Sequence, residues 1–204
     1  FPNHYSIATG LYAENTGIVA NNMYDEEMDE YFSLGNHAAV TNPDWWGGEP
    51  IWVTAEKQDV RTATMFWPGS EAPIKDTYAT RWMPYNDDLD YTARVDSIVS
   101  WLQVTDITEP DFLTLYFSKV DSYGHRYGTD SDSVRVAVEE MDAHLGYLVE
   151  ELKRVGEWGN VNILITSDHG MANVSEERVI LLDDLINPDD VEVIDWTPVA
   201  MIQP

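Results

Sequence analysis

The chain has 204 residues, and its composition indicates a folded domain with a hydrophobic core. Apolar residues make up 44% of it and aromatic residues 12%, which excludes a disordered chain. It carries 37 Asp and Glu against 11 Lys and Arg, a formal net charge of -26. A field of that sign repels nucleic acids and anionic membranes, so a nucleic-acid duplex is excluded as a partner. A phosphate ester could be a substrate only if bound cations inverted the local field.

Cysteine is absent from the sequence, so disulfides and thiolate ligands are excluded. Any metal must therefore be bound by Asp, His, Glu or Thr. No apolar run approaches the roughly 20 residues that span a bilayer. The chain begins at Phe1 with neither an initiating Met nor a signal peptide, and it ends at Pro204. We therefore expect residues 1–204 to be an internal piece of a longer protein.

Helices and strands are predicted to alternate along the chain. Residues 1–10 have Pro2 and Gly10 at positions that suit the first turn and the end of a helix. Residues 11–49 show no periodicity and are expected to be irregular. This alternation predicts an α/β fold, with a mixed, mostly parallel sheet and helices on both of its faces. Further helices are predicted at 50–58, 90–104 and 131–155, and strands at 60–67, 112–117, 161–167, 179–182 and 191–194.

An apolar run at residues 161–167 ends on polar residues that are suited to chemistry. Its continuous aliphatic side chains are typical of a strand buried on both faces. Asp168 and His169 follow at once, and parallel sheets carry their chemistry just past the carboxyl ends of such strands. A carboxylate oxygen and an imidazole nitrogen are good ligands for zinc or a similar divalent cation. Taken alone, the pattern more often marks a strand that ends in a polar turn.

A second Asp-His pair follows the strand predicted at 112–117. Asp121 comes just past this strand and His125 four residues later, with a glycine between them that eases a turn. The strands 112–118 and 161–167 and the helix between them form a predicted β-α-β unit, which brings both carboxyl ends to one edge of the sheet. Two Asp-His pairs at that edge are what a two-metal site for phosphoryl transfer needs. Without the other pair, Asp121 is equally a turn cap and His125 a surface residue.

Here the sequence resembles the nucleotide pyrophosphatase/phosphodiesterase family of the alkaline phosphatase superfamily, and its cysteine-free bacterial members in particular. The matching stretches occur in family order over residues 1–171. They are Phe1-Pro-Asn-His-Tyr, Thr9-Gly-Leu-Tyr12, Gly17-Ile-Val-Ala-Asn21-Asn22-Met-Tyr-Asp25, Asn42-Pro43-Asp-Trp45, Glu49-Pro-Ile-Trp-Val-Thr-Ala55, Phe66-Trp-Pro-Gly-Ser70, Asp121-x-x-Gly-His125 and Thr166-Ser-Asp-His-Gly-Met171.

The resemblance implies a phosphodiesterase that uses two zinc ions. By analogy with the family, Asp121 and His125 bind one zinc, and Asp168 and His169 bind the other. Asn21 matches the family's asparagine that holds a phosphate oxygen. From the sequence pattern alone, Asn21 would be a turn residue.

The family's nucleophile is a threonine directly before the Phe-Pro-Asn motif, so we expect it just before Phe1 and outside this chain. It attacks phosphorus and forms a phosphothreonine that water then hydrolyses. An N-terminal Asp ligand, and an Asp and a His downstream of residue 204, are also expected outside the chain. We therefore expect residues 1–204 to be part of a catalytic domain and, alone, to be inactive.

The resemblance also implies a pocket for a nucleotide base. In the family the base lies between the phenylalanine after the nucleophile, here Phe1, and a later tyrosine, here Tyr85. Trp67 lies in the loop that lines the same pocket. Stacking tolerates different bases because each base has a π-face. Each of these aromatic residues could equally belong to the core, and His4, His37 and His144 are expected to be structural or surface residues.

Alternative functions remain open on the sequence. The expected reaction is hydrolysis of nucleotide phosphodiester and pyrophosphate bonds to nucleoside 5′-monophosphates. A phosphodiesterase for choline-type lipid head groups would use the same site, with Glu71 and Asp87 near Tyr85 to attract a cation. A catalytically dead relative that binds nucleotides or a partner protein is the non-enzyme alternative. A periplasmic or secreted location follows from the resemblance only.

Overall fold

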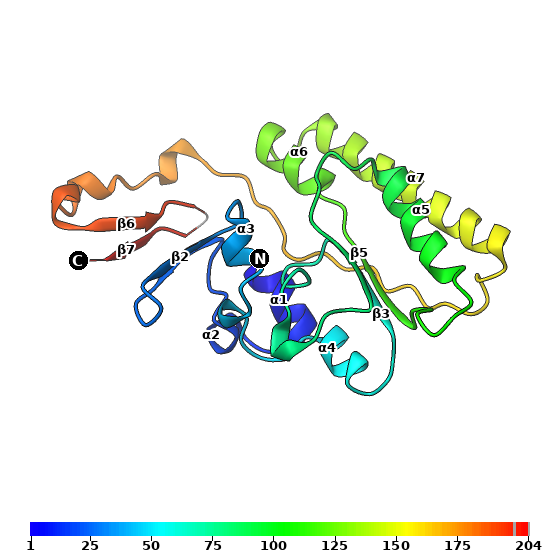
Figure 1. The fold of residues 1–204 in the computed structure, drawn as a ribbon. Helices are drawn as coiled ribbons and strands as arrows, with labels where there is room; N and C mark the ends of the chain where they lie inside the picture. The colour runs from blue at the N-terminus through cyan, green and yellow to red at the C-terminus, as the bar shows by residue number, and fades with distance from the viewer. Residues whose placement is uncertain (198, 204) are drawn as a thin grey trace.

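A three-stranded parallel sheet forms the centre of the fold in the computed structural model, which describes residues 1–197 and 199–203 (Figure 1). The strand β3 (Thr62–Met65) lies between β4 (Arg81–Met83) and β5 (Phe112–Leu115). In register, Thr62 pairs with Phe112 and Ala63 with Arg81. All of β3 is buried, as expected for the central strand of a parallel sheet that is covered on both faces. The predicted α/β class is confirmed.

Helices cover the sheet from both sides (Figure 1). The helices α5 (Tyr91–Leu102) and α7 (Asp132–Val155) pack together on one side, and α6 (Lys119–Tyr127) packs against α7. The helices α1 (Pro2–Thr9) and α4 (Ile51–Glu56) lie on the other side, where α4 contacts β3. The predicted helices at 1–10, 50–58, 90–104 and 131–155 are therefore confirmed, each with shorter bounds.

Local sequence signals account for the ends of these helices. The side chain of Asp90 accepts a hydrogen bond from the backbone N–H of Thr92 and caps α5. Ser131 caps α7 in the same way, through the N–H of Val134. Gly156 ends α7 at a φ of 89°, a left-handed conformation that glycine adopts without steric cost. Of the apolar side chains of α7, Ala137 and Leu152 are buried, while Val138 is exposed.

Residues 11–49 are more regular than the sequence predicts. An antiparallel hairpin of β1 (Asn22–Asp25) and β2 (Glu30–Ser33) is followed by the short helix α3 (His37–Val40). These elements surround an aromatic core that the sequence pattern does not reveal, because its members follow neither a helical nor a strand period. The core includes Tyr5, Phe32, Trp45, Trp46 and Trp52.

The C-terminal hairpin lies beside the first one. It consists of β6 (Glu192–Asp195) and β7 (Met201–Gln203), and β6 contacts β1. The hydroxyl of Tyr31 donates a hydrogen bond of 3.0 Å to Glu192 Oε1 across this contact. The strand predicted at 191–194 is thus confirmed. The remaining short elements are α2 (Ala13–Thr16), η1 (Pro43–Trp45), η2 (Ile74–Asp76), η3 (Glu176–Arg178), η4 (Leu182–Asp184) and η5 (Pro188–Asp190).

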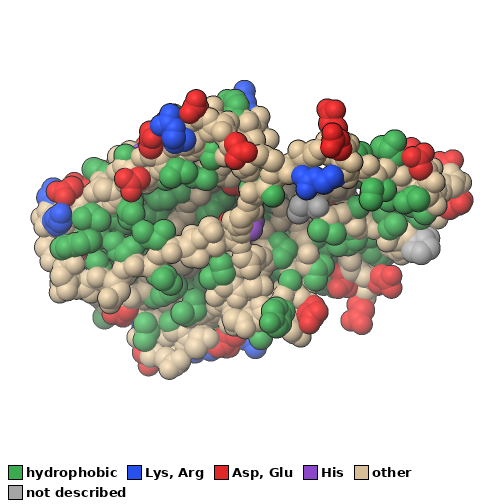
Figure 2. Space-filling view, turned by 180° about the vertical axis from the view of Figure 1, so that it is seen from behind, with side chains coloured by type: hydrophobic (Ala, Val, Ile, Leu, Met, Phe, Trp, Pro, Cys, Tyr) green, Lys and Arg blue, Asp and Glu red, His purple; other side chains and the backbone are tan. Residues whose placement is uncertain are grey.

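The predictions of strands at 161–167 and 179–182 are wrong. Without the strand at 161–167, the predicted β-α-β unit lacks its second strand. Residues 161–167 form an extended segment that crosses the back of the sheet (Figure 1) without pairing to a strand in the described part of the chain. Leu164 is 92% exposed and Ile165 69%. From behind, apolar side chains are spread over this face (Figure 2). The apolar pattern is that of a buried strand, but a strand forms only beside a partner that accepts its hydrogen bonds.

Within the described residues, none of the helices has the combined length and hydropathy of a membrane-spanning segment.

The carboxylate of Glu56 joins the beginnings of two neighbouring strands. Its Oε1 accepts hydrogen bonds from the backbone N–H groups of Thr62 and Thr80, at 2.7 Å and 2.8 Å. The hydroxyls of the same threonines and the guanidinium of Arg61 are also donors to this carboxylate. The side chain of Glu56 is 8% exposed. Burial opposes its ionisation, but the hydrogen bonds outweigh burial and hold the pKa of Glu56 below its ordinary value.

We predict that Glu56→Ala lowers the free energy of unfolding by at least about 3 kcal/mol, because it leaves two buried backbone N–H groups without acceptors. Chemical denaturation checks this. The control is Glu139→Ala, which removes a 62% exposed carboxylate paired with Arg135 and should cost under about 1 kcal/mol.

The pH dependence of stability should also differ between the parent protein and Glu56→Gln. A carboxyl with a depressed pKa contributes stability above its unfolded pKa, about 4.3, and loses it as the pH falls through the lower folded value. The parent should therefore lose stability below about pH 4 more steeply than Glu56→Gln, which does not titrate. Equal slopes for the two proteins would contradict this role.

Candidate metal and substrate site

Asp121 and His125 lie on one face of α6, not in the turn that the sequence predicts. They are separated by one helical turn, and His125 Nε2 lies 3.4 Å from Asp121 Oδ1. The helix begins just after β5, so the pair stands at the carboxyl end of that strand, as predicted. The side chain of His125 is 70% exposed, which leaves its nitrogen accessible from solvent.

Asp168 and His169 lie on the extended segment that follows α7. His169 Nε2 is 3.3 Å from Asp168 Oδ2. The backbone N–H of His169 donates a hydrogen bond of 3.0 Å to Asp168 Oδ1, and His169 Nδ1 lies 2.9 Å from the carbonyl oxygen of Gly170. These local bonds orient the imidazole so that Nε2 faces the carboxylate.

The two pairs meet at one place, as the sequence predicts, although only one of them follows a strand of the sheet. His169 Nε2 lies 3.9 Å from Asp121 Oδ1. This oxygen is shielded from solvent and accepts no hydrogen bond from the described residues. An unpaired buried carboxylate oxygen is costly, and a bound cation would compensate it.

The distances within the pairs suit a metal ligand set. Two ligands on a tetrahedral zinc, each about 2.0–2.1 Å from the ion, are about 3.3 Å apart. The separations of 3.4 Å in one pair and 3.3 Å in the other agree with that value. Among the described residues no group of three or more His, Asp and Glu forms a fuller cluster. Each Asp-His pair thus brings together two side chains with the chemistry of metal ligands.

The first turn of α1 contacts Asp168, which sequence reasoning missed. His4 Nδ1 lies 3.2 Å from Asp168 Oδ2, and the side-chain amide of Asn3 donates a hydrogen bond to the carbonyl oxygen of Asp168. Burial lowers the pKa of His4, while the carboxylate of Asp168 acts in the opposite direction. His4 was expected to be structural, yet it supports a metal-ligand candidate. The signal that could have revealed this role is the position of His4 in the first turn of a helix whose N-terminus faces the site.

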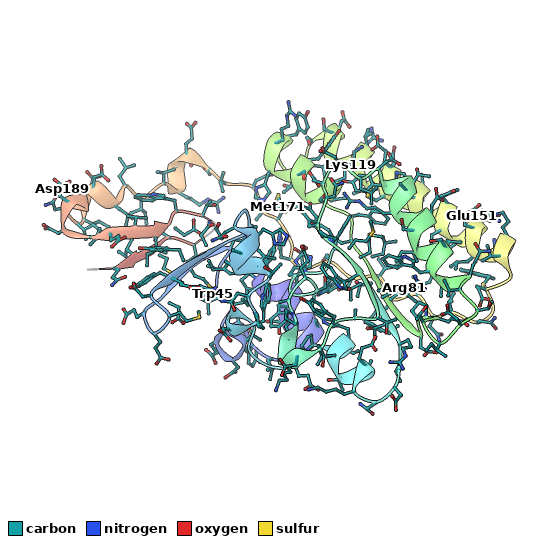
Figure 3. All side chains as sticks on the ribbon, viewed as in Figure 1. Trp45, Arg81, Lys119, Glu151, Met171 and Asp189 are labelled. Atoms are coloured by element: carbon teal, nitrogen blue, oxygen red, sulfur yellow. The ribbon has the colours of Figure 1, made fainter. Side chains whose placement is uncertain are left out.

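Two contacts hold the segment after His169 against α6. Gly124 allows close approach, because a Cβ atom there would lie 2.5 Å from Met171 Sδ. Figure 3 labels Met171 where the extended segment passes α6. The side-chain oxygen of Asn173 accepts hydrogen bonds from the backbone N–H and the hydroxyl of Thr129, at 3.1 Å and 2.7 Å. The glycine of the Asp-x-x-Gly-His stretch thus serves packing between the two pairs and not the turn that was predicted.

Phe1 and Asn21 lie at the same site. The backbone nitrogen of Phe1 donates a hydrogen bond of 3.0 Å to Asn21 Oδ1. The carboxylates of Asp168 and Asp121 act electrostatically on this nitrogen. The ring of Phe1 packs against Phe32, at 6.2 Å between centroids. Its ring therefore covers the aromatic core while its backbone faces the acids.

Trp67 and Tyr85 belong to a chain of aromatic rings that runs through His4. The indole N–H of Trp67 donates to the carbonyl oxygen of His4 at 3.0 Å. The ring of Tyr116 lies 5.2 Å from that of His4 and 6.5 Å from that of Tyr85. Tyr85 is 49% exposed, so its ring is open to a ligand. Phe66 has a φ of 61°, which is rare for a bulky residue and turns the chain sharply after β3.

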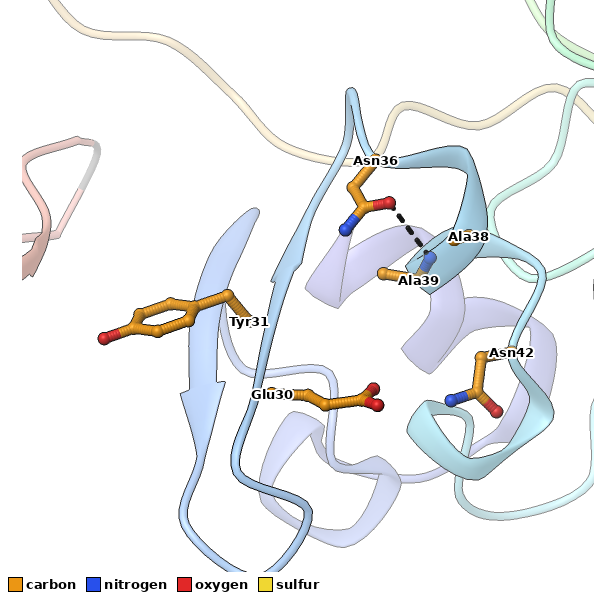
Figure 4. Close-up of a pocket in the computed structure, with 6 residues that line it drawn as sticks. All are labelled: Glu30, Tyr31, Asn36, Ala38, Ala39 and Asn42. Carbon is orange, nitrogen blue, oxygen red and sulfur yellow. Dashed lines mark hydrogen bonds between the residues drawn. The ribbon is translucent and has the colours of Figure 1, made fainter.

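A separate pocket of about 540 Å³ lies between β2 and α3 (Figure 4). Its lining includes Glu30, Tyr31 and Asn42. The side chain of Asn36 there accepts a hydrogen bond of 3.3 Å from the N–H of Ala39 and so caps α3. None of the predicted site residues lines this pocket, and it contains no Asp-His pair.

Known proteins resemble the chain over its whole length. The family model for type I phosphodiesterase/nucleotide pyrophosphatase matches residues 1–204. Bis(5′-adenosyl)-triphosphatase ENPP4 of Bos taurus is 44% identical over 207 residues, which cover 100% of this chain and 45% of that protein. Venom phosphodiesterase 2 of Crotalus adamanteus is 43% identical over 190 residues, which cover 93% of this chain and 23% of that protein.

A solved structure has the same fold. Inactive murine ectonucleotide pyrophosphatase/phosphodiesterase 5, a threonine-to-alanine variant in complex with AMP, superimposes with a TM-score of 0.93 at 38% identity. The match covers 100% of this chain and 54% of that one. The chain thus spans about half the length of these relatives or less. With its family model matched from end to end and its fold shared with a solved member, the chain belongs to the type I phosphodiesterase/nucleotide pyrophosphatase family.

Proposed function

We propose that the chain is part of the catalytic domain of an enzyme that hydrolyses phosphodiester and pyrophosphate bonds of nucleotides to nucleoside 5′-monophosphates. The meeting of two Asp-His pairs beside the first turn of α1 carries this proposal. Paired acid and imidazole ligands suit the two-cation chemistry of phosphoryl transfer. The relatives named as a triphosphatase and as phosphodiesterases support the reaction class.

The cations in this proposal are two zinc ions. Asp121 and His125 would hold one, and Asp168 and His169 the other. Imidazole nitrogen with carboxylate oxygen, and no thiolate, is a ligand set that zinc accepts. When bound, such ions supply positive charge that stabilises the oxygens around a phosphorus undergoing displacement. They would also offset the repulsion between a phosphate and a chain of net charge -26.

The nucleophile in this proposal is a threonine placed directly before Phe1, outside residues 1–204. There it would lie at the N-terminus of α1, where the helix dipole favours a developing negative charge. The threonine-to-alanine variant of the murine relative, described as inactive, supports such a role. Asn21 would donate a hydrogen bond from its side-chain amide to a phosphate oxygen. By this proposal the isolated chain is inactive.

The substrate in this proposal is a nucleotide whose base stacks between Phe1 and Tyr85, with Trp67 nearby. The AMP complex of the murine relative supports a nucleotide ligand. The carboxylates expected to attract a choline group are already engaged with Tyr85. Glu71 Oε1 accepts its backbone N–H at 3.0 Å, and Asp87 Oδ1 accepts its hydroxyl at 2.8 Å. This favours the nucleotide over the lipid head group.

The enzyme is proposed to act outside the cytoplasm, in the periplasm or as a secreted protein. One relative is named as a venom enzyme and another as an ectonucleotide pyrophosphatase, which supports an extracellular site of action.

Residues 161–167 are proposed to pair with a strand that precedes the nucleophile in the complete protein. Their apolar pattern and the exposure of Leu164 and Ile165, at 92% and 69%, support a missing neighbour. The proposed domain is therefore completed by segments on both sides of this chain, which would also supply the remaining metal ligands.

The complete gene product should hydrolyse a nucleotide diester much faster than glycerophosphocholine. We expect kcat/KM to differ by at least about 100-fold, because base stacking adds binding that the choline ester lacks. Steady-state assays of both substrates by one preparation check this. A preference for glycerophosphocholine would establish the lipid head-group alternative, and activity on neither would establish a dead relative.

Measurements of zinc binding should distinguish the two Asp-His pairs. The complete gene product should hold two zinc ions per chain by equilibrium dialysis and elemental analysis. Asp121→Asn with His125→Ala should weaken one of them at least about 100-fold and retain the other, because ligand loss exceeds the cost of losing an outer-shell partner. His37→Ala, which removes an exposed imidazole, is the control. Two tightly bound zinc ions in the double variant would contradict the assignment.

Amide hydrogen exchange tests the pairing of residues 163–166. In the complete gene product these amides should exchange at least about 100-fold more slowly than in isolated residues 1–204, because only there would they donate to a neighbouring strand. Amides in α7 serve as the internal reference. Equally fast exchange in both proteins would refute the missing strand.

A further inference from the structure

Arg94 is a fully buried charged residue around which one loop is folded. It lies on α5, and its side chain is 0% exposed. Its Nε donates to the carbonyl oxygen of Leu89 at 3.0 Å, and its Nη2 donates to those of Asn86 and Asp87 at 3.4 Å and 3.3 Å. Its Nη1 donates to the carbonyl oxygen of Tyr116 at 3.0 Å. One guanidinium thus binds the loop 84–90 to the end of β5.

No carboxylate among the described residues forms a close ion pair with this guanidinium. The nearest carboxylate oxygen, Asp87 Oδ1, is 3.8 Å from Nη2. The charge is instead compensated by carbonyl dipoles and by the ring faces of Phe66 and Tyr91, whose centroids lie 4.9 Å and 4.7 Å from Cζ. Carbonyl groups of a loop point into the protein interior only where a buried donor forms hydrogen bonds with them. The conformation of the loop therefore depends on Arg94.

Asp87 connects the same loop to the start of the metal-ligand helix. Its Oδ1 accepts the hydroxyl of Tyr85 at 2.8 Å and that of Ser118 at 3.1 Å. Ser118 directly precedes α6, which carries Asp121. Burial and the bond to Asp87 raise the pKa of Tyr85 to about 12, so the hydroxyl remains a donor at neutral pH.

From these contacts we infer that Arg94 and Asp87 are positioning residues, which hold the ring of Tyr85 at a set place relative to α6. The inference rests on the proposed function, in which Tyr85 stacks on the nucleotide base and α6 binds a cation at the phosphate. The two residues then act on the base alone and not on the chemistry. They fix the distance between the ring of Tyr85, on which the base stacks, and the site that binds the phosphate.

Preorganisation is the physical reason for such a role. The ring of Tyr85 is half exposed and is held edge-on to Phe66, at 5.3 Å between centroids. A loop free to move would lose conformational entropy when it closed on a base, and affinity for nucleotides would fall. A small diester without a base would not require that ordering, so its turnover would be unchanged.

The test uses Asp87→Ala, Ser118→Ala and Arg94→Lys in the complete gene product, with Asp88→Ala as the matched control. Asp88 is an exposed carboxylate of the same loop, so the control removes the same charge. We expect Asp87→Ala and Arg94→Lys to raise the Kd of AMP about tenfold and Ser118→Ala about threefold, because these changes remove one or two hydrogen bonds. Turnover of bis(p-nitrophenyl) phosphate should stay within about twofold.

Thermal melting confirms that each variant is folded, and Asp87→Ala and Ser118→Ala keep the test usable if Arg94→Lys does not fold. Tyr85→Ala distinguishes a failure of the positioning inference from a failure of the proposed base pocket. If Tyr85→Ala weakens AMP binding while Asp87→Ala and Ser118→Ala bind AMP like the parent, the positioning inference is wrong and the proposed pocket stands. If Tyr85→Ala binds AMP like the parent, the proposed pocket itself is wrong. Equal losses in AMP affinity and in turnover of bis(p-nitrophenyl) phosphate would show a merely structural role.

Discussion

The parallel pairing of β3 with β4 and β5 is the constraint on which the rest of the structure depends. Because parallel strands end at the same edge, three chain segments leave the sheet side by side. The segment after β5 becomes α6, with its Asp-His pair. The segment after β3 carries Phe66 and Trp67, and the one after β4 carries Tyr85. Glu56 stabilises this arrangement from the opposite edge, where it binds the beginnings of β3 and β4.

Electrostatics explain why the site takes its form. The chain has a net charge of -26, and two of its carboxylates are held close together at the site, with one oxygen of Asp121 shielded and unpaired. Such a cluster is unfavourable without positive charge. Two imidazoles lie within 4 Å of the acids, and in the proposed function a bound divalent cation would supply the positive charge. In the proposed function, cations bound at this site allow a strongly acidic protein to attract a phosphate.

The two Asp-His pairs are held by different means. The pair on α6 is rigid because a helix fixes the spacing of its members. The pair at 168–169 lies on an extended segment and depends on neighbours, namely the first turn of α1 on one side and Gly124 with Thr129 on the other. Arg94 acts similarly for the loop that carries Tyr85. Side-chain contacts therefore hold the segments that the sheet itself does not fix.

The sequence by itself determined the helices α1, α4, α5 and α7, two strands of the sheet and the four metal-ligand candidates, because periodicity, caps and ligand chemistry are local properties. It did not determine the parallel partner β4, the aromatic core, or the contacts of Asn3 and His4 with Asp168, because these join residues far apart in the chain. Residues 161–167 show the limit most clearly. Their apolar pattern is that of a buried strand, yet no strand forms, because pairing requires a neighbour whose hydrogen-bonding groups only the tertiary structure can supply.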